Sequence, residues 1–330
     1  MLRQDSMPEN SKGIPDFVWI KNRDATDGHQ VYDSSRGPLK DINPDSNAVE
    51  GTTNDGLQKF LKGGFEIEDD VSINTADEQY VAWNWVANGG TEVANTDGSG
   101  ATLASTIQAN QTAGFSIVRY TGTNSNKTIA HGLSSAPECI ITKNLTASSA
   151  SWAVYHKDMT SAAYTLFLDT TAAQTSSSTM WNSTAPTSSV FSVGANFQSN
   201  GSSNSMIAYC WHSVKGFSKF GTYEGNNNND GAFVYLGFKP ALLIVKSLDE
   251  AYGWRMYDNA RNPANPMSNT ILADVTTAEN TSTYSADFLS NGFKQRDSYS
   301  STNAAVTYIY MAWAEHPFNG DGSNAFATAR

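Results

Sequence analysis

The sequence GFSKFGTYEGNNNNDGAFVYLGFKPALLIVKS, residues 216–247, contains the pattern that decides the fold. Two short segments rich in aromatic and β-branched residues flank a run of four asparagines, and Pro240 precedes an apolar segment that ends at Lys246. Short runs of this kind, bounded by Asn, Gly and Pro, are typical of β-strands. The stretch therefore predicts a hairpin followed by a buried strand.

The same proline, lysine and tyrosine recur along the chain at nearly constant spacing. Lys246 lies six residues after Pro240 and eleven before Tyr257. The pattern has two further copies: Pro137, Lys143 and Tyr155, and Pro15, Lys21 and Tyr32. Each copy continues with a phenylalanine and then an aromatic residue 18, 18 or 20 positions later: Phe65 and Trp83, Phe191 and Tyr209, and Phe293 and Trp313. This agreement predicts three tandem repeats of roughly 100 residues.

These copies divide the chain into repeat 1 (1–86), a Gly- and Asn-rich linker (87–101), repeat 2 (102–214) and repeat 3 (215–330, with a short C-terminal tail). Repeats 2 and 3 share an opening strand, GFSIVRYTG from Gly114 and GFSKFGTYEG from Gly216, which repeat 1 lacks. The asparagine run matches TNSNK in repeat 2 and predicts a hairpin tip. We hypothesise that a strand from another chain completes repeat 1 by addition at a sheet edge.

An all-β fold follows from the same pattern. Apolar runs of five to eight residues, separated by turn residues, fill each repeat. We therefore expect tandem antiparallel β-sandwiches, of jelly-roll or lectin-like type, with little helix. The period is too long for propeller blades. Weak helical periodicity occurs at residues 54–61, where one or two turns of helix are expected.

Composition excludes several classes of function. The net charge is −11, and no stretch gathers the Lys and Arg that phosphate binding needs, so neither nucleic acid nor an anionic membrane surface is an expected partner. No apolar run reaches the length of a membrane helix, and the polar N-terminus does not look like a signal peptide. Cys139 and Cys210 lie in apolar runs, as buried free thiols or, alternatively, as a disulfide.

No motif for catalysis, cofactor binding or metal binding is present, so we expect a protein that is not an enzyme and has no cofactor. The histidines show no close metal spacing, and the acidic segment EIEDD (66–70) lacks the ligand pattern of a calcium loop. The repeated lysine is expected to reach solvent or to pair with a carboxylate. Asp33 with Arg36, and Asp258 with Arg261, are expected to fasten turns, and repeat 2 has His156 and Met159 instead.

Several segments resemble an uncharacterised repeat family of tail-fibre and other structural proteins of tailed, especially marine, bacteriophages. They include PDFVWIKNR, GFSIVRYTGT, PALLIVKSLD, DFLSNGFK and YIYMAWAEHPF, and the resemblance covers about residues 15–318. It implies a virion protein, assembled in the host cytoplasm and bound to other virion proteins, as a tail fibre, tail appendage or head decoration that contributes to host attachment. Because phage fibres are usually trimeric, the expected assembly is a homo-oligomer, with a trimer favoured.

A carbohydrate-binding module is the alternative, with a host surface glycan as ligand and exposed indoles as stacking platforms. The candidates are Trp181, Trp152 and Trp254. Trp152 and Trp254 occupy equivalent places in their repeats, which favours a packing role for both. Trp181 lies in a loop-like stretch and is the better candidate.

Overall fold

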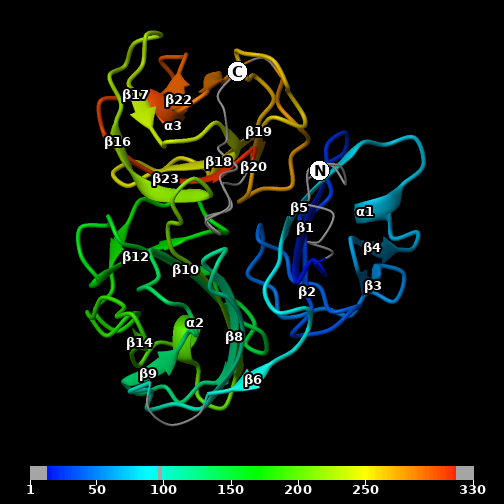
Figure 1. The fold of residues 1–330 in the computed structure, drawn as a ribbon, viewed down its shortest axis with the longest axis vertical. Coiled ribbons are helices and arrows are strands. Elements are labelled where there is room, and N and C mark those ends of the chain that lie inside the picture. Colours follow the sequence, from blue (N-terminus) through cyan, green and yellow to red (C-terminus); the bar gives the residue numbers. More distant parts are fainter. Residues whose placement is uncertain (1–12, 96–98, 282, 317–330) are drawn as a thin grey trace, which may run out of the picture. The chain divides into compact units, whose positions relative to one another are not determined.

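The computed structural model describes residues 13–95, 99–281 and 283–316. They form antiparallel sheets with three one-turn helices, which confirms the all-β sandwich prediction (Figure 1). The helices are α1 (Val71–Asn74), α2 (Phe197–Asn200) and α3 (Ser300–Asn303). The chain divides into two compact units, of which the first holds repeats 1 and 2 and the second most of repeat 3.

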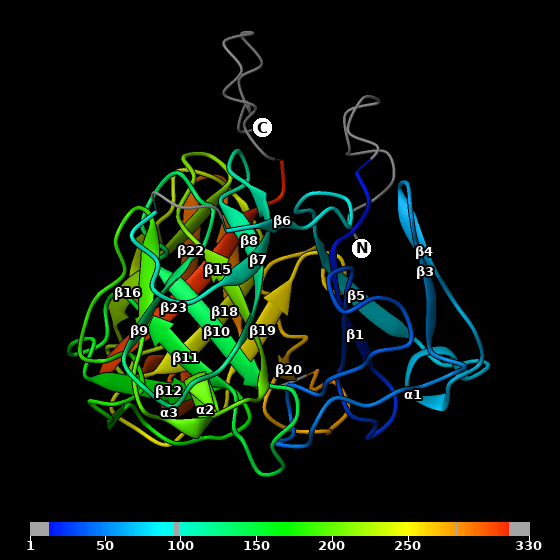
Figure 2. The same cartoon turned by 90° about the horizontal axis from the view of Figure 1, so that it is seen from below.

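The first sheet of repeat 1 has the order β2-β1-β5. Its strands are β1 (Phe17–Asn22), β2 (Gln30–Asp33) and β5 (Tyr80–Trp85). The β3 (Leu57–Leu61) and β4 (Gly64–Ile67) hairpin forms a second layer beside β1 and β5 (Figure 2). A core cluster that includes Val18, Ile20 and Leu57 joins these layers. The helix expected at 54–61 is wrong: Phe60 pairs with Phe65 across a two-residue turn, where Gly63 adopts a φ of +83° that suits glycine.

Repeat 2 contains the same arrangement with additional strands. Its first sheet has the order β13-β12-β11-β10-β15-β8-β7-β6, and β9 pairs with β14 in a second layer. The strands are β6 (Val93–Ala94), β7 (Ser105–Asn110), β8 (Phe115–Thr121), β9 (Lys127–Ala130), β10 (Cys139–Asn144), β11 (Ala153–His156), β12 (Tyr164–Phe167), β13 (Thr175–Ser176), β14 (Val190–Val193) and β15 (Ser205–Trp211). Both cysteines are free and fully buried in the first sheet.

Repeat 3 has the sheets β16-β23-β18-β19-β20 and β17-β22-β21. The strands are β16 (Ser218–Glu224), β17 (Phe233–Tyr235), β18 (Pro240–Ser247), β19 (Arg255–Asp258), β20 (Ile271–Leu272), β21 (Ala286–Leu289), β22 (Gly292–Gln295) and β23 (Thr307–Ala314). Residues from both sheets, among them Leu243, Tyr257 and Phe293, form one buried core.

Strand register shows that the three repeats are equivalent. The repeated lysine faces the same position of the neighbouring strand in each copy: Lys21 faces Val81, Lys143 faces Ile207 and Lys246 faces Ile309. This register corrects one detail of the sequence alignment. The position that corresponds to Trp83 and Tyr209 is Met311, 18 residues after Phe293, and not Trp313.

The linker predicted at 87–101 is in large part structured. Strand β6 belongs to it and extends the sheet of repeat 2 by pairing with β7. The buried carboxylate of Asp16 accepts hydrogen bonds from the amides of Ala87, Gly89 and Gly90, at 2.6–2.9 Å. A buried carboxylate needs such donors to offset its lost hydration. The start of the linker is therefore fastened to repeat 1.

Repeats 1 and 2 share one aromatic cluster within the first unit. The ring of Phe17 in β1 lies 4.7 Å from Tyr209 and 5.3 Å from Trp85, and Phe115 stacks on Trp211 at 5.1 Å, all measured between ring centroids. The hydroxyl of Tyr209 donates to Asp33 at 2.7 Å. Buried aromatic pairs of this geometry stabilise a fold beyond the area that they bury.

Candidate functional site

All three tryptophans proposed as sugar platforms are buried. Trp152 and Trp181 are 1% exposed, and Trp254 is fully buried. The indole nitrogen of Trp152 donates to the main-chain oxygens of Asn43 and Ser46, at 2.9 and 3.1 Å. A stacking platform must present a ring face to its ligand. The structure therefore does not support glycan stacking on any of the three. Trp181 lies in a loop, as expected, but its ring is buried.

The repeated lysines are fully buried, so the expectation that they reach solvent is wrong. Their ammonium groups donate to main-chain oxygens of the loop that follows each strand. Lys143 donates to Ala150 at 2.6 Å, Lys21 to Ala25 at 3.1 Å and Lys246 to Glu250 at 3.4 Å. The carbonyl oxygens replace the water that each ammonium loses on burial. The lysine thus fastens a loop in each repeat.

A repeated aspartate, which sequence reasoning missed, accompanies the lysine. Asp45 accepts a hydrogen bond from the amide of His29 at 2.9 Å, and Asp169 accepts one from the amide of Trp152 at 3.0 Å. Burial raises the pKa of both carboxyl groups, and it lowers the pKa of Lys143 to about 8 against the opposing effect of Asp169. Lys143 is fully buried, whereas Asp45 and Asp169 are half-buried. Their hydrogen bonds hold main-chain groups of neighbouring segments, so their role is structural.

This aspartate recurs in the sequence, but its distance from the repeated tyrosine varies. It follows the repeated tyrosine by 13 residues at Asp45, 14 at Asp169 and 17 at Asp274. Strand pairing explains why this spacing varies. In every repeat the aspartate lies three residues after a residue that pairs with the strand of the repeated tyrosine. These residues are Ile42, Leu166 and Ile271.

The Asp and Arg pairs fasten turns, as predicted. Arg36 and Asp33 are 2.5 Å apart, and so are Arg261 and Asp258. Each arginine also donates to a main-chain oxygen two residues before its aspartate, Val31 in the first case, at 3.0 Å. The side chains of both pairs are at most 5% exposed, which leaves no face for a substrate.

The opening hairpins of repeats 2 and 3 are each held by a buried asparagine that sequence reasoning also missed. In repeat 2, the side-chain oxygen of Asn200 accepts from the amide of Thr123 at 2.8 Å, and its main-chain oxygen accepts from the amide of Asn124 at 2.7 Å. Asn303 makes the same two contacts with the asparagine run of repeat 3, at 3.1 and 2.6 Å. The run is thus a hairpin tip docked on α3. Both asparagines follow the repeated phenylalanine, by nine and ten residues.

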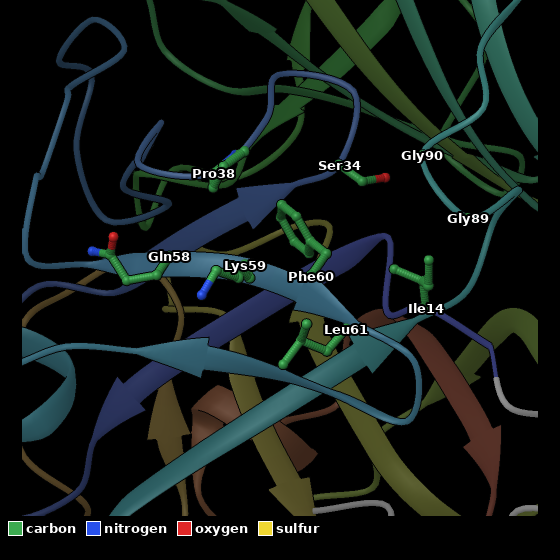
Figure 3. A pocket seen from close by; sticks show the side chains of 9 residues that line it. All are labelled: Ile14, Ser34, Pro38, Gln58, Lys59, Phe60, Leu61, Gly89 and Gly90. Atoms are coloured by element: carbon green, nitrogen blue, oxygen red, sulfur yellow. The ribbon is translucent and has the colours of Figure 1, made fainter.

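A shallow groove of about 360 Å³ lies on repeat 1 (Figure 3). Ile14, Phe60 and Leu61 supply apolar surface, and Gly89 and Gly90 form part of the rim. Lys59 is the one titratable residue of the lining, and it is paired with Glu66 at 2.9 Å. The groove therefore offers apolar contact but no pair of groups for acid–base or nucleophilic chemistry.

Neither a metal cluster nor a membrane helix occurs in the described part of the chain. Among residues 13–95, 99–281 and 283–316, no three His, Cys, Asp or Glu side chains come together as metal ligands would. Within the same residues, no helix has the length and apolar character needed to cross a membrane. The acidic segment at 66–70 spans the end of β4 and the cap of α1, where Asp70 accepts from the amide of Ser72.

Comparison with known proteins identifies one family. The model of DUF7483, described as a domain of unknown function, matches residues 9–317. No curated protein matches the chain significantly, and no solved structure does. Because the match extends across all three repeats, the chain belongs to the DUF7483 family.

Proposed function

We propose that this chain is a non-enzymatic structural protein of a tailed-bacteriophage particle, in a tail fibre or other tail appendage that contributes to host attachment. The proposal rests on the structural role of the repeated polar side chains. The repeated Lys, Asp, Arg and Asn residues are engaged in holding loops and turns, and no group of three His, Cys, Asp or Glu side chains in the described residues could hold a metal ion. Tandem sandwiches joined through a shared core are suited to a mechanical role.

The resemblance of the repeat motifs to phage structural proteins supplies the biological setting. It also favours a symmetric homo-oligomer, with a trimer as the first candidate, and virion proteins as partners. A head decoration fits the same features and is the alternative within this class. The three tryptophans proposed to stack on a glycan, Trp152, Trp181 and Trp254, are buried, so they do not support the glycan-binding alternative.

Mass spectrometry of purified particles of a phage that encodes this chain tests the proposal. We expect its peptides in intact particles at a fixed ratio to the known structural proteins, and antibody labelling on the tail in electron micrographs. Labelling on the head would favour the decoration role. Peptides found in infected cells but absent from purified particles would refute both.

A further inference from the structure

We propose that repeat 1 is a receptor for a β-hairpin of another polypeptide, and that this hairpin carries the pattern Tyr-x-Gly-x-Asn at the end of its first strand and the start of its turn. The binding surface, called here the repeat 1 socket, comprises the free edges of β5 and β4 together with Phe65, Tyr80 and α1. The inference rests on the geometry of the repeats and goes beyond the proposed function.

The first part of the socket is the outer edge of β5. In repeats 2 and 3 the equivalent strands, β15 and β23, pair on that side with the opening strands β8 and β16. Among the residues that the structure describes, strand β5 pairs only with β1. The amide of Arg23 donates to the main-chain oxygen of Gln79. Hydrogen-bonded and non-hydrogen-bonded pairs alternate along an antiparallel ladder, so the amides of Ala82 and Asn84 point away from β1. Neither amide has a hydrogen-bond partner in the described part of the chain, and both residues are partly exposed.

The second part of the socket is the outer edge of β4. Its equivalents pair with the second strand of the opening hairpin: β14 with β9 in repeat 2, and β22 with β17 in repeat 3. Strand β4 pairs only with β3 in the described part of the chain. Phe65 remains partly exposed, whereas Phe191 and Phe293 at the same position are 1% and 0% exposed. Within residues 13–95, 99–281 and 283–316, both layers of repeat 1 therefore lack the strand that the opening hairpin supplies in repeats 2 and 3.

Asn74, at the end of α1, retains the features that hold a hairpin tip. It corresponds to Asn200 and Asn303, and its side-chain nitrogen donates to the main-chain oxygen six residues earlier, Glu68, at 2.8 Å. Asn200 and Asn303 make that same contact at 3.0 and 2.7 Å. Asn74 is exposed, however, and neither its side-chain oxygen nor its main-chain oxygen accepts a hydrogen bond from any described residue. These are the two acceptors that bind the hairpin tip in repeats 2 and 3.

A tyrosine is the side chain that the socket fits best. Tyr223 of β16 stacks on Tyr308 with ring centroids 5.1 Å apart, packs on Phe293 at 5.7 Å, and donates to the main-chain oxygen of Thr302 in α3 at 2.6 Å. Tyr120 of β8 makes the equivalent hydrogen bond to α2. In repeat 1 the matching groups are Tyr80, Phe65 and the main-chain oxygen of Ile73, and no described residue donates to that oxygen.

The glycine and asparagine of the pattern follow from the backbone. A Cβ on Gly225 would lie 1.9 Å from the main-chain oxygen of Ala304, and a Cβ on Gly122 would meet the equivalent oxygen at 2.1 Å, so only glycine fits. Asn124 and Asn227 have φ values of 49° and 53°, a conformation that asparagine tolerates. The sequences YTGTN and YEGNN share these positions, and a hairpin bound to repeat 1 needs them for the same reasons.

The occupant is assigned to another polypeptide because the chain's own hairpins are already engaged. Strands β8 and β16 pair along their full lengths with β15 and β23. Freeing either hairpin to fill repeat 1 would open an equal gap in the repeat that it left. Added strands gain main-chain hydrogen bonds along a free edge, and side-chain pockets then select the sequence.

Fluorescence anisotropy with a labelled synthetic peptide, identical to residues 216–238, tests the socket on the full chain. We expect saturable binding of one peptide per chain. Peptides with Tyr→Ala or Gly→Ala in the pattern should bind at least tenfold more weakly. In the protein, Asn74→Ala should weaken binding about tenfold. Ala82→Pro, which removes an outward amide from the edge strand, should abolish it. Lys40→Ala, at an exposed position beyond the other edge of the sheet, is the matched control and should leave binding unchanged.

Hydrogen exchange on the unaltered protein makes the test independent of how Ala82→Pro folds. Bound peptide should slow the exchange of the Ala82 and Asn84 amides and leave the amides of β8 and β16 unchanged. Absence of saturable binding, or binding that protects other strands, would overturn the proposal. Self-association that protects β5 in the absence of peptide would make a second copy of this chain the occupant and overturn the assignment to another polypeptide.

Discussion

Replacing Asn303 with alanine is expected to release the opening hairpin of repeat 3 from α3. The Asn303 side chain accepts from the amide of Asn226 at 3.1 Å and donates to Asn226, Asn228 and Asp297, at 3.1, 2.7 and 2.7 Å. Three of these hydrogen bonds, those to Asn226 and Asn228, reach the hairpin. At roughly 0.5–1.5 kcal/mol each, they hold it by about 1.5–4.5 kcal/mol. The side chain is fully buried, so water does not replace these contacts while the hairpin stays docked.

Hydrogen exchange resolved by mass spectrometry measures this release locally. At about 1.4 kcal/mol per tenfold change, the amides of β16 and β17 should exchange at least roughly tenfold faster in Asn303→Ala than in the unaltered chain. Asn74→Ala is the matched control, since Asn74 occupies the same place in repeat 1 and makes a single side-chain hydrogen bond, to Glu68. It should leave β16 and β17 unchanged. Equal exchange of β16 in the two variants would refute the role assigned to Asn303.

Three further results are expected from burial of titratable groups. Since the pKa of Lys143 falls to about 8 in the folded chain from an ordinary 10.5, the unfolded state binds more protons between these values. The free energy of unfolding of the native chain relative to Lys143→Met should therefore rise by up to about 3 kcal/mol from pH 8 to 10.5, and a flat difference in urea titrations would contradict this. Burial lowers the pKa of His131 to about 4, so the native chain should lose stability relative to His131→Gln as pH falls from 6.5 toward 4, measured by thermal unfolding; no difference between the two across that range would rule this out. Burial raises the pKa of the Cys139 and Cys210 thiols, and an Ellman assay should detect both only after unfolding; rapid reaction of the native chain would show that either thiol is accessible.

The sequence predicted the repeated architecture because its marks are local. Pro240, Lys246 and Tyr257 keep their order and spacing in all three copies, and strand alternation follows from short apolar runs. The prediction that repeat 1 lacks the opening hairpin has the same basis, because the opening strands from Gly114 and Gly216 can be compared directly with residues 1–86. Register at β23 was misassigned because Met311 is not aromatic and Trp313, two residues later, is.

Burial was harder to predict than strand order. A lysine at the end of an apolar run usually extends to solvent. No residue near Lys143 in the sequence indicates that the following loop covers its side chain. Trp181 was placed on a loop correctly in the coarse sense, but long-range packing against Tyr155 encloses it. Asn200 and Asn303 escaped notice because asparagine is abundant throughout the chain, and only their contacts distinguish them.

The aromatic cluster shared by repeats 1 and 2 has a consequence for how the chain can be divided. The repeating pattern counts three segments, yet Phe17 and Trp85 from one segment and Phe115 and Trp211 from the next bury one another. A protein truncated between these two segments would expose several large rings on each half and would be expected to aggregate. Truncation near residue 213, where the two compact units meet in sequence, leaves this cluster whole. The segments that repeat in the sequence and the compact units of the fold therefore divide the chain at different places.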